Sequence, residues 1–345
     1  MQKVVEVLVV DDSAFMRKTV SALIESFPQF KVIGKARNGV DAIEKTKRLT
    51  PDLITLDIEM PELDGLETLK VLMKEHPVPV IMLSSGSEST LEAFELGAVD
   101  FVVKESIIKE LTEIERENLF ERLQAAVNAK LPIPAIKENK EERQKDQPLQ
   151  HKIIAQKELL FIGSSTGGPA ALQTILTNFS ADFPIPIVVV QHMPPGFTKP
   201  LAERFNGLFH LHVKEAEHNE ILLPGTVYIA PAGLQTNIMK NSLGSYQMKL
   251  KLSAPIETLY KPSIDVTLLS IAPYIKDKLL AVILTGMGDD GLRGCRLVKE
   301  YGGNVLAESE ETCVVYGMPK VVHEAGLTDE QASIHQMHEL IMNYI

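Results

Sequence analysis

The sequence predicts an α/β protein built from two doubly wound parallel-sheet domains. Short apolar runs of strand length, such as Val5–Val10 and Leu159–Ile162, alternate with segments whose apolar residues recur at helical spacing. The 345 residues are enough for two hydrophobic cores. A polar stretch, Lys137–Lys152, separates the two series of strands and helices and contains Leu149 as its one large aliphatic residue.

We therefore place the domains at residues 1–125 and 156–345, joined by a flexible linker at 126–155. The prolines of Leu131–Pro134 end the last helix of the first domain, since proline cannot continue a helix. The polar stretch that follows cannot bury enough apolar surface to order itself. A short exposed helix over Glu138–Lys145 is the alternative, and it would still leave a linker.

Composition excludes several classes of protein. The formal net charge of −11 disfavours a nucleic-acid-binding surface. No apolar run approaches the ~18 residues of a membrane span, and the N-terminus lacks the apolar region of a signal peptide. We expect a cytoplasmic, monomeric protein in which Cys295 and Cys313 are buried reduced thiols.

The first domain contains five strands followed by helices, which predicts a parallel sheet with helices on both faces. The predicted strands are Val5–Val10, Val32–Ala36, Leu53–Asp57, Val78–Leu83 and Phe101–Val103. The predicted helices are Ser13–Phe27, Val40–Leu49, Leu66–Glu75, Glu88–Leu96 and one final helix after the fifth strand. Ligands of such sheets bind beyond the carboxyl ends of the strands.

Carboxylates lie at those ends. Asp11 and Asp12 follow the first strand, and Asp57 ends the third. Three carboxylates in one crevice would repel one another, and a hard divalent cation, expected to be Mg²⁺, would remove that repulsion. At the neighbouring strand ends, Lys104 and Ser84 could contact the oxygens of a phosphoryl group. A helix N-cap explains a single aspartate at a strand end but not this set.

The second domain begins with a strand, the glycine-rich turn Gly163–Pro169 and a helix over Ala170–Asn178. This turn places a serine hydroxyl beside the free N–H groups of a helix N-terminus, which suits a bound phosphate or the oxyanion of acyl transfer. A simple tight connection is a further interpretation. The spacing fits neither a P-loop nor the dinucleotide-binding G-x-G-x-x-G pattern.

Two more polar residues follow predicted strands. His192 comes directly after Ile185–Val190 and Gln191, and Asp290 lies in the loop after Leu279–Leu284. Taken singly, the histidine is more often structural, and the aspartate could cap the helix Leu292–Tyr301. Together with the serine turn, they supply a nucleophile, a general base and an orienting acid at one edge of a sheet.

The first half resembles the two-component receiver domain, which is a flavodoxin-like fold. The resemblance covers about the first 125 residues and is carried by Val9–Ser13, Asp57–Pro61, Ser84 and Phe101–Lys104. It implies that Asp57 accepts a phosphoryl group from a histidine kinase. It also implies that Asp11, Asp12 and Asp57 hold Mg²⁺, and that Ser84, Phe101 and Lys104 form the switch.

One departure concerns the switch. Receivers usually have Lys-Pro, often with a cis bond, where this chain has Lys104-Glu105. Because a cis bond before a residue other than proline costs ~2.5–4 kcal/mol, we expect a trans bond here.

The second half resembles the chemotaxis protein-glutamate methylesterase family, a Rossmann-like α/β domain with an antiparallel hairpin. The matching segments are Gly163–Pro169, Gln191–Phe197, Pro224–Pro231, Leu284–Gly291 and Cys313–Pro319. A receiver, a linker and this esterase domain are the family's architecture, so the resemblance extends over nearly the whole chain.

This second resemblance implies roles for single residues. Ser165, the serine directly before Thr-Gly-Gly, is the nucleophile, and His192 and Asp290 complete the triad. The backbone N–H of Met287 is the oxyanion donor, and Thr166 lines the site. Asp289 departs from the pattern, and a second carboxylate there could compete with Asp290 for the histidine.

The function implied is hydrolysis of glutamate γ-methyl esters on chemoreceptors, the methyl-accepting chemotaxis proteins, with release of methanol. Deamidation of receptor glutamines by the same site is also implied. The esterase chemistry itself needs no cofactor. A phospho-dependent scaffold with an inactive crevice is the alternative, and a transcriptional regulator is disfavoured because the second half shows neither a helix-turn-helix pattern nor a basic stripe.

Overall fold

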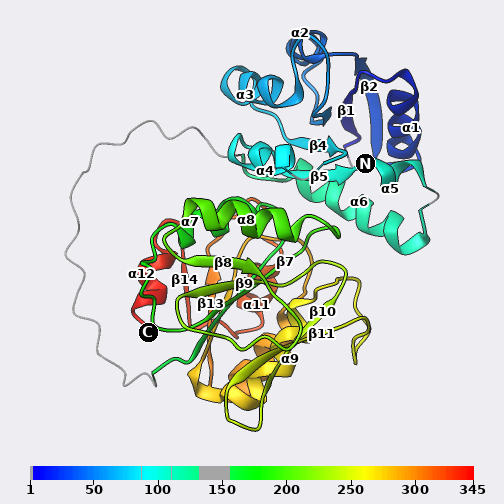
Figure 1. Cartoon of the computed structure of the whole chain (residues 1–345). Helices are drawn as coiled ribbons and strands as arrows, with labels where there is room; N and C mark the ends of the chain where they lie inside the picture. Colours follow the sequence, from blue (N-terminus) through cyan, green and yellow to red (C-terminus); the bar gives the residue numbers. More distant parts are fainter. Residues whose placement is uncertain (1–2, 87, 110, 132–155) are drawn as a thin grey trace.

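The computed structural model describes residues 3–86, 88–109, 111–131 and 156–345. The expected linker falls largely in 132–155, outside the described residues. The chain forms two parallel sheets, each covered by helices on both faces, and these lie one above the other in Figure 1. The predicted fold class is confirmed. No helix in the described ranges is long and apolar enough to cross a membrane.

The first sheet has five parallel strands in the order β2-β1-β3-β4-β5. The strands are β1 (Val5–Val10), β2 (Phe30–Ala36), β3 (Leu53–Asp57), β4 (Val80–Ser84) and β5 (Asp100–Val103). Successive side chains of a strand face opposite sides of a sheet. Leu8 and Val10 accordingly pack in one apolar core, and Val7 and Val9 in another. An apolar strand with two buried faces explains why the run has no polar alternation.

Four of the helices of this half begin at a polar residue whose side chain caps the first turn, namely Ser13, Asn38, Asp64 and Thr112. The helices are α1 (Ala14–Glu25), α2 (Gly39–Leu49), α3 (Gly65–Glu75), α4 (Glu88–Glu95), α5 (Lys104–Ile108) and α6 (Glu113–Val127). The sequence predicts one helix after the fifth strand, whereas the structure has two. The break falls where Thr112 and Glu115 form a capping box, which starts α6 afresh. The bond between Lys104 and Glu105 is trans, as expected.

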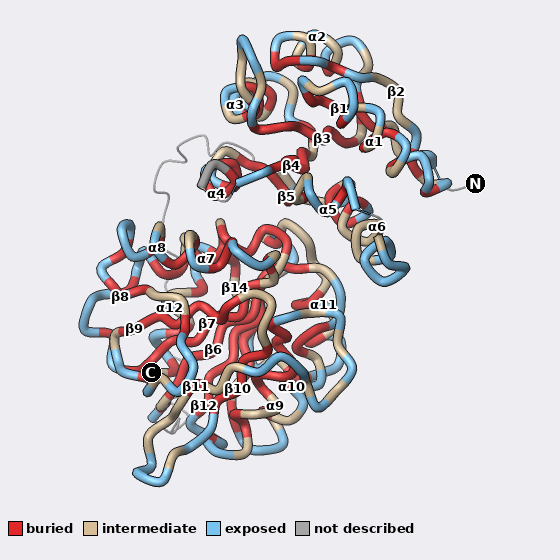
Figure 2. Tube along the Cα trace, turned by 45° about the vertical axis from the view of Figure 1, so that its right-hand side comes forward, coloured by how far each residue is buried: buried red, intermediate tan, exposed pale blue. Residues whose placement is uncertain are grey.

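The second sheet has seven parallel strands in the order β14-β13-β12-β6-β7-β9-β8. They are β6 (Leu159–Ser164), β7 (Ile187–Gln191), β8 (His212–Glu215), β9 (Thr226–Ile229), β12 (Leu279–Ile283), β13 (Asn304–Glu308) and β14 (Glu330–Ala332). A separate antiparallel hairpin joins β10 (Gln235–Lys240) to β11 (Tyr246–Lys251). The three central strands β12, β6 and β7 are fully buried, and Figure 2 shows this burial along the middle of the sheet.

Helices cover both faces of this sheet. They are α7 (Gly168–Leu176), α8 (Thr198–Leu208), α9 (Ile264–Ile275), α10 (Leu292–Glu300), α11 (Met318–Glu324) and α12 (Met337–Met342), with a 3₁₀ turn at Lys276–Lys278. One face packs against α7, α8 and α12, and the other against α9, α10 and α11. Cys295 and Cys313 are buried free thiols, and burial raises the pKa of each.

The two halves meet through α4, β5 and α6 of the first and α7 and α8 of the second, as both views show. The rings of Phe101 and Phe197 lie 4.7 Å apart across this interface, and both are buried. Arg204 and Glu95 form an ion pair with an N–O distance of 2.6 Å. Because Phe101 and Phe197 belong to one continuous apolar cluster, the hydrophobic core runs from one half into the other.

Candidate active site and acidic pocket

Three neighbouring strands deliver the predicted serine, histidine and aspartate to one edge of the second sheet. Ser165 and His192 directly follow β6 and β7, and Asp290 lies in the loop after β12. The sheet order β12-β6-β7 makes these strands adjacent, so their carboxyl ends meet. The Nε2 atom of His192 lies 2.8 Å from Oδ2 of Asp290.

His192 has one ring nitrogen engaged and one free. Its side chain is 8 % exposed, and Asp290 occupies Nε2. Among the described residues, none hydrogen-bonds to the buried Nδ1. A buried polar atom without a partner is costly, and such atoms collect at sites of function. Nδ1 is therefore the nitrogen available to exchange a proton with a neighbouring hydroxyl.

Asp290 is held as an anion by the start of helix α9. It accepts hydrogen bonds from the backbone N–H groups of Ile264 at 2.7 Å and Asp265 at 2.9 Å, and from the hydroxyl of Ser263 at 2.8 Å. Burial alone would raise the pKa of the Asp290 carboxyl, but the hydrogen bond and charge of His192 and these N–H groups outweigh it and lower the pKa. The neighbouring Asp289 is exposed, and the His192 bond goes to Asp290.

The structure separates the two serines of the turn. Ser164 is fully buried and donates its hydroxyl to Oε1 of Gln191 at 2.6 Å. Ser165 is half-buried and lines the same cavity as His192. Gly286 packs against it so closely that a Cβ added there would lie 2.7 Å from Cβ of Ser165. Ser165 is thus the serine that faces the site.

The loop after β12 also contributes backbone groups. Met287 and Thr166 line the cavity with Ser165. The N–H of Gly286 donates to Val315, whereas the N–H of Met287 donates to no acceptor in the hydrogen-bond network of the described residues. Thr166 is buried, and its carbonyl accepts from the hydroxyl of Thr285. The loop is therefore fixed directly before a free N–H group.

Sequence reasoning missed three side chains that build this site. Gln191 donates from Nε2 to the carbonyls of Ser165 and His192, at 2.9 and 3.0 Å. Ser263 supports Asp290, and the ring of Tyr260 stacks on that of His192. Gln191 stood beside the predicted histidine and could have been suspected from that position. Ser263 and Tyr260 come from a loop more than 60 residues away along the chain and gave no local signal.

The cavity at this site has a volume of about 740 Å³ and lies between the two halves of the chain. The second half contributes Ser165, His192 and Met287 to its lining. The first half contributes residues of β5, α5 and α6, among them Phe101 and Arg122. Arg122 is fixed by two hydrogen bonds of 2.8 Å to the carboxylate of Asp100. The first half therefore covers the opening through which a large substrate would enter.

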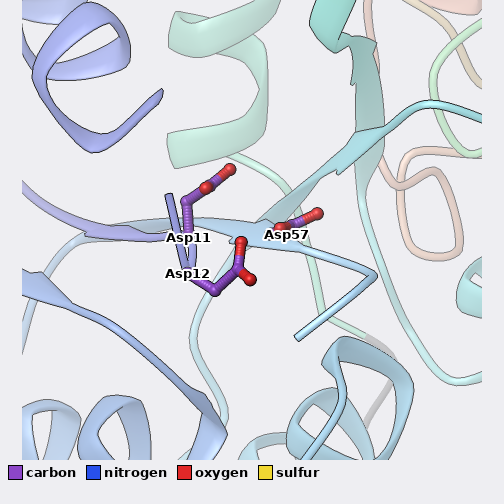
Figure 3. Close-up of side chains that lie close together, drawn as sticks. All are labelled: Asp11, Asp12 and Asp57. Carbon is purple, nitrogen blue, oxygen red and sulfur yellow. The ribbon is translucent and has the colours of Figure 1, made fainter. Parts of the chain in front are cut away.

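The predicted acidic cluster forms at the edge of the first sheet. One carboxylate oxygen from each of Asp11, Asp12 and Asp57 lies within 4.8 Å of the others, and Figure 3 shows the three side chains close together. Lys104 contacts Asp57 at 2.6 Å and Asp11 at 3.0 Å. Burial, with the Asp11 charge adding to it and Lys104 opposing it, raises the pKa of Asp57 to about 6.

These residues fit a hard divalent cation. All three donors are carboxylate oxygens, which Mg²⁺ prefers, and they have the spacing of ligands to one ion. The buried Oδ2 of Asp57 finds no hydrogen-bond partner among the described residues, which leaves it free to bind a cation or a phosphoryl group. The pKa of Asp57 is raised because its carboxylate is buried with too little positive charge around it.

Of the predicted switch residues, Lys104 contacts the acidic pocket itself, whereas Ser84 and Phe101 lie on the neighbouring strands β4 and β5. Ser84 is buried at the end of β4 and accepts hydrogen bonds from the hydroxyl of Thr90 at 2.6 Å and from the N–H of Gly86 at 3.1 Å. Phe101, in β5, contacts Phe94 within its own half and Phe197 in the other. Ser84 is therefore held within its own half, whereas Phe101 reaches the second.

Known proteins share both halves of this arrangement. Residues 7–115 match the response regulator receiver domain, and residues 160–341 match the CheB methylesterase domain. A solved structure of the Thermotoga maritima CheB methylesterase catalytic domain is 46% identical, with a TM-score of 0.53, and the match covers 55% of this chain and 100% of that one. These matches define the class as a response regulator with a methylesterase output domain.

Relatives of full length narrow the class to a family. Proteins named protein-glutamate methylesterase/protein-glutamine glutaminase from Halalkalibacterium halodurans and Thermotoga maritima are each 45% identical, over 99% of this chain and 99% of theirs. One of the same name from Archaeoglobus fulgidus is 41% identical over 98% of this chain and 97% of its own. The chain belongs to the CheB methylesterase family.

Proposed function

We propose that this chain hydrolyses γ-methyl esters of glutamate side chains on chemoreceptors, with Ser165, His192 and Asp290 as its catalytic triad. The observation that carries the proposal is the 2.8 Å contact between His192 and Asp290, at the wall of a cavity that Ser165 also lines. A hydroxyl, an imidazole and a buried carboxylate in this order supply a nucleophile, a general base and an orienting acid.

In the acylation step, Nδ1 of His192 takes the proton of Ser165 as the serine oxygen attacks the ester carbonyl. Asp290, whose pKa is lowered, stays ionised and stabilises the imidazolium that forms. The tetrahedral oxyanion receives a hydrogen bond from the N–H of Met287. The imidazolium returns its proton to the leaving methoxy group, and methanol departs.

In the second step, water replaces the alcohol. His192 accepts a proton from the water molecule as it attacks the acyl-serine, and the proton returns to Ser165 when the ester bond breaks. The products are a free glutamate and the regenerated enzyme. A glutamine amide passes through the same kind of tetrahedral intermediate with ammonia as the leaving group, so the same site would deamidate receptor glutamines.

We propose that a phosphoryl group on Asp57 controls this reaction. A chemotaxis histidine kinase would be the donor, and Asp11, Asp12 and Asp57 would hold Mg²⁺, which neutralises the charge of the transferred group. The support is the acidic cluster and the position of the first half over the cavity. Phosphorylation would favour a state in which Ser84, Phe101 and Lys104 rearrange and the interface with Phe197 opens.

The proposal includes an organisation for the chain. The receiver domain would comprise residues 1–125 and the esterase domain 156–345, with a flexible linker at 126–155 that keeps the two at high local concentration. The protein would act as a cytoplasmic monomer and reach the membrane through its receptors alone.

The test is methanol release from methylated chemoreceptor membranes, with and without a small-molecule phosphodonor and Mg²⁺. We expect release that rises with the donor, no rise in Asp57→Ala, and no release in Ser165→Ala. Full release by Ser165→Ala would reject the triad. Release that ignores the donor would keep the esterase and reject the control by Asp57, and no release at all would favour a scaffold protein with an inactive crevice.

A further inference from the structure

We propose that Tyr260 is a positioning residue for the general base, setting the plane of the His192 imidazole and the distance of that ring from the loop that carries Met287. The proposal rests on the triad proposed above. It starts from a geometric gap: the bond to Asp290 fixes the ring at Nε2 but leaves the ring free to turn about that contact. The proton-accepting atom, Nδ1, has no partner among the described residues that would stop this rotation.

The stack with Tyr260 supplies the missing constraint. The two ring centroids lie 4.0 Å apart, and the ring planes differ by 3°. A ring that turned about the Asp290 contact would have to leave this parallel arrangement or collide with the tyrosine. One hydrogen bond and one parallel ring face together determine where Nδ1 points.

The backbone that carries Tyr260 is tied to the support of Asp290. Gln235, which is fully buried, donates from Nε2 to the carbonyl of Tyr260 at 2.7 Å and accepts from the N–H of Ser263 at 3.0 Å. Ser263 in turn donates its hydroxyl to Asp290 at 2.8 Å. One short segment, Tyr260–Ser263, therefore carries both the tyrosine that stacks on the imidazole and the serine that supports Asp290.

The far end of the tyrosine ring reaches the loop after β12. A Cβ added at Gly288 would lie 3.3 Å from the hydroxyl oxygen of Tyr260, so this oxygen sits directly against the glycine. Gly288 has a positive φ of 82°, which side chains rarely adopt, and it follows Met287. Tyr260 thus contacts both the imidazole and the loop that carries the predicted oxyanion donor, Met287.

The charge of the phenol suits this position. Burial, followed by the carboxylates of Glu121, Asp290 and Asp289, raises the pKa of Tyr260 to about 12, so the ring stays neutral. A neutral aromatic face attracts a cation, and His192 becomes a cation during the proposed reaction. The stack would therefore hold the ring in the ground state and stabilise it once it is protonated.

The experiment compares two variants in the full-length chain activated with a phosphodonor and Mg²⁺. Tyr260→Phe keeps the ring face, and Tyr260→Leu removes it while filling the space with apolar atoms. We expect the leucine variant to lose about tenfold in kcat, part of the ~10²–10⁴ that a general base contributes, with a smaller change in KM because the stacked ring acts on the base. The phenylalanine variant keeps the stacked face and loses just the hydroxyl beside Gly288, so it should recover most of the kcat that the leucine variant loses.

Two controls separate the possible outcomes. Tyr274→Leu changes an exposed tyrosine of α9 and should leave kcat unchanged. Ser165→Ala tests the triad itself. If this variant is inactive while Tyr260→Leu keeps full kcat, the triad stands and the positioning role of Tyr260 is rejected. An active Ser165→Ala rejects the triad and the positioning role with it. A leucine variant with a normal activated kcat and a raised resting rate would assign Tyr260 to the domain interface and overturn the proposal.

Discussion

Asp290 caps the start of α9, and Asp265, in the first turn of α9, caps the start of α10. Asp290, just before α10, accepts from the N–H groups of Ile264 and Asp265 at the start of α9. Asp265, in the first turn of α9, accepts from the N–H groups of Gly291 at 3.0 Å and Gly294 at 2.7 Å at the start of α10. Because each carboxylate satisfies the free N–H groups of the opposite helix, the two helix starts are locked together with the acid of the proposed triad between them.

The contribution of Asp265 to the free energy of unfolding depends on pH. Burial, with the charge of Asp290 adding to it, raises the pKa of Asp265 to about 6. The folded protein therefore holds a proton that the unfolded chain, with an ordinary aspartate, releases near pH 4. The contribution of this group to stability is full below pH 4 and is lost as the pH rises through 6.

We expect Asp265→Asn, which keeps an oxygen acceptor and removes the charge, to be free of this loss. Relative to the wild type, its free energy of unfolding should increase by about 1 kcal/mol between pH 5 and pH 7. Urea denaturation followed by circular dichroism at the two pH values would measure the difference. Asp277→Asn, at an exposed site after α9, is the control and should show no such trend. A difference that does not change with pH would contradict the raised pKa.

Much of this architecture is predictable from the sequence because strands buried on both faces are continuous apolar runs. Such runs identify β1 and β6, and polar residues at their carboxyl ends identify the sites, since parallel strands all end at one edge. Asp57 and His192 lie where this reasoning puts them. The fold class is confirmed, whereas the catalytic roles of these residues remain predictions.

The supporting residues could not be predicted in the same way. Ser263 contacts Asp290, Tyr260 contacts His192, and Gln235 bonds to both supporting residues. These contacts join distant parts of the chain and follow no periodic pattern. From its neighbours in the sequence, Ser263 is predicted to be just the N-cap of α9, a role that it also fills. A helix start that holds the side chain of another loop depends on tertiary packing, which local propensity does not encode.

The aromatic contact across the interface predicts a variant with a higher resting activity. Phe197→Leu keeps apolar volume in the second half but removes the ring that lies 4.7 Å from Phe101. Aromatic pairs contribute about 0.5–1.5 kcal/mol beyond their buried area, so the resting rate of methanol release should rise about two- to tenfold. The phosphodonor-activated rate should stay near that of the wild type. Phe15→Ala, which removes an exposed ring of α1, should change neither rate, and equal resting rates in all three proteins would argue against obstruction by the receiver.

The ion pair between Glu95 and Arg204 allows a test by charge reversal. Both side chains are about one-third exposed, so the pair is worth no more than about 1 kcal/mol. Glu95→Arg should raise the resting rate by about two- to fivefold, since like charges would then face each other. The double variant Glu95→Arg/Arg204→Glu should recover the resting rate of the wild type. Loss of the effect in high salt would support an electrostatic cause, and no recovery in the double variant would reject the contact.

Removal of Mg²⁺ should affect the acidic cluster of the first half and leave the proposed triad unaffected. A chelator is expected to abolish the increase in methanol release caused by the phosphodonor, because the carboxylates of Asp11, Asp12 and Asp57 would no longer be neutralised. The resting rate should not change, since the proposed triad uses no metal. Asp57→Asn should behave like the chelated wild type. A chelator that also lowers the resting rate of Asp57→Asn would show that the esterase itself needs a cation.

Gln191 offers the most direct test of how the turn and the base are held together. Its side chain is buried, and it bonds to the Ser164 hydroxyl and to the carbonyls of Ser165 and His192. Its Oε1 lies so close to Gly168 that an added Cβ there would be 1.9 Å away. Any side chain at position 168 would therefore collide with the glutamine.

Gln191→Met would fill the same space while leaving those two carbonyls without their side-chain donor. Since an unsatisfied buried group costs about 1–3 kcal/mol, we expect a loss of stability of at least this size. The kcat should fall by about 10- to 100-fold with little change in KM, because a small displacement of nucleophile and base costs rate more than binding. Ser164→Ala removes just the hydroxyl contact and should keep most of the activity. An inactive Ser164→Ala beside an active Gln191→Met would show that the Ser164 hydroxyl, and not the glutamine, holds the turn.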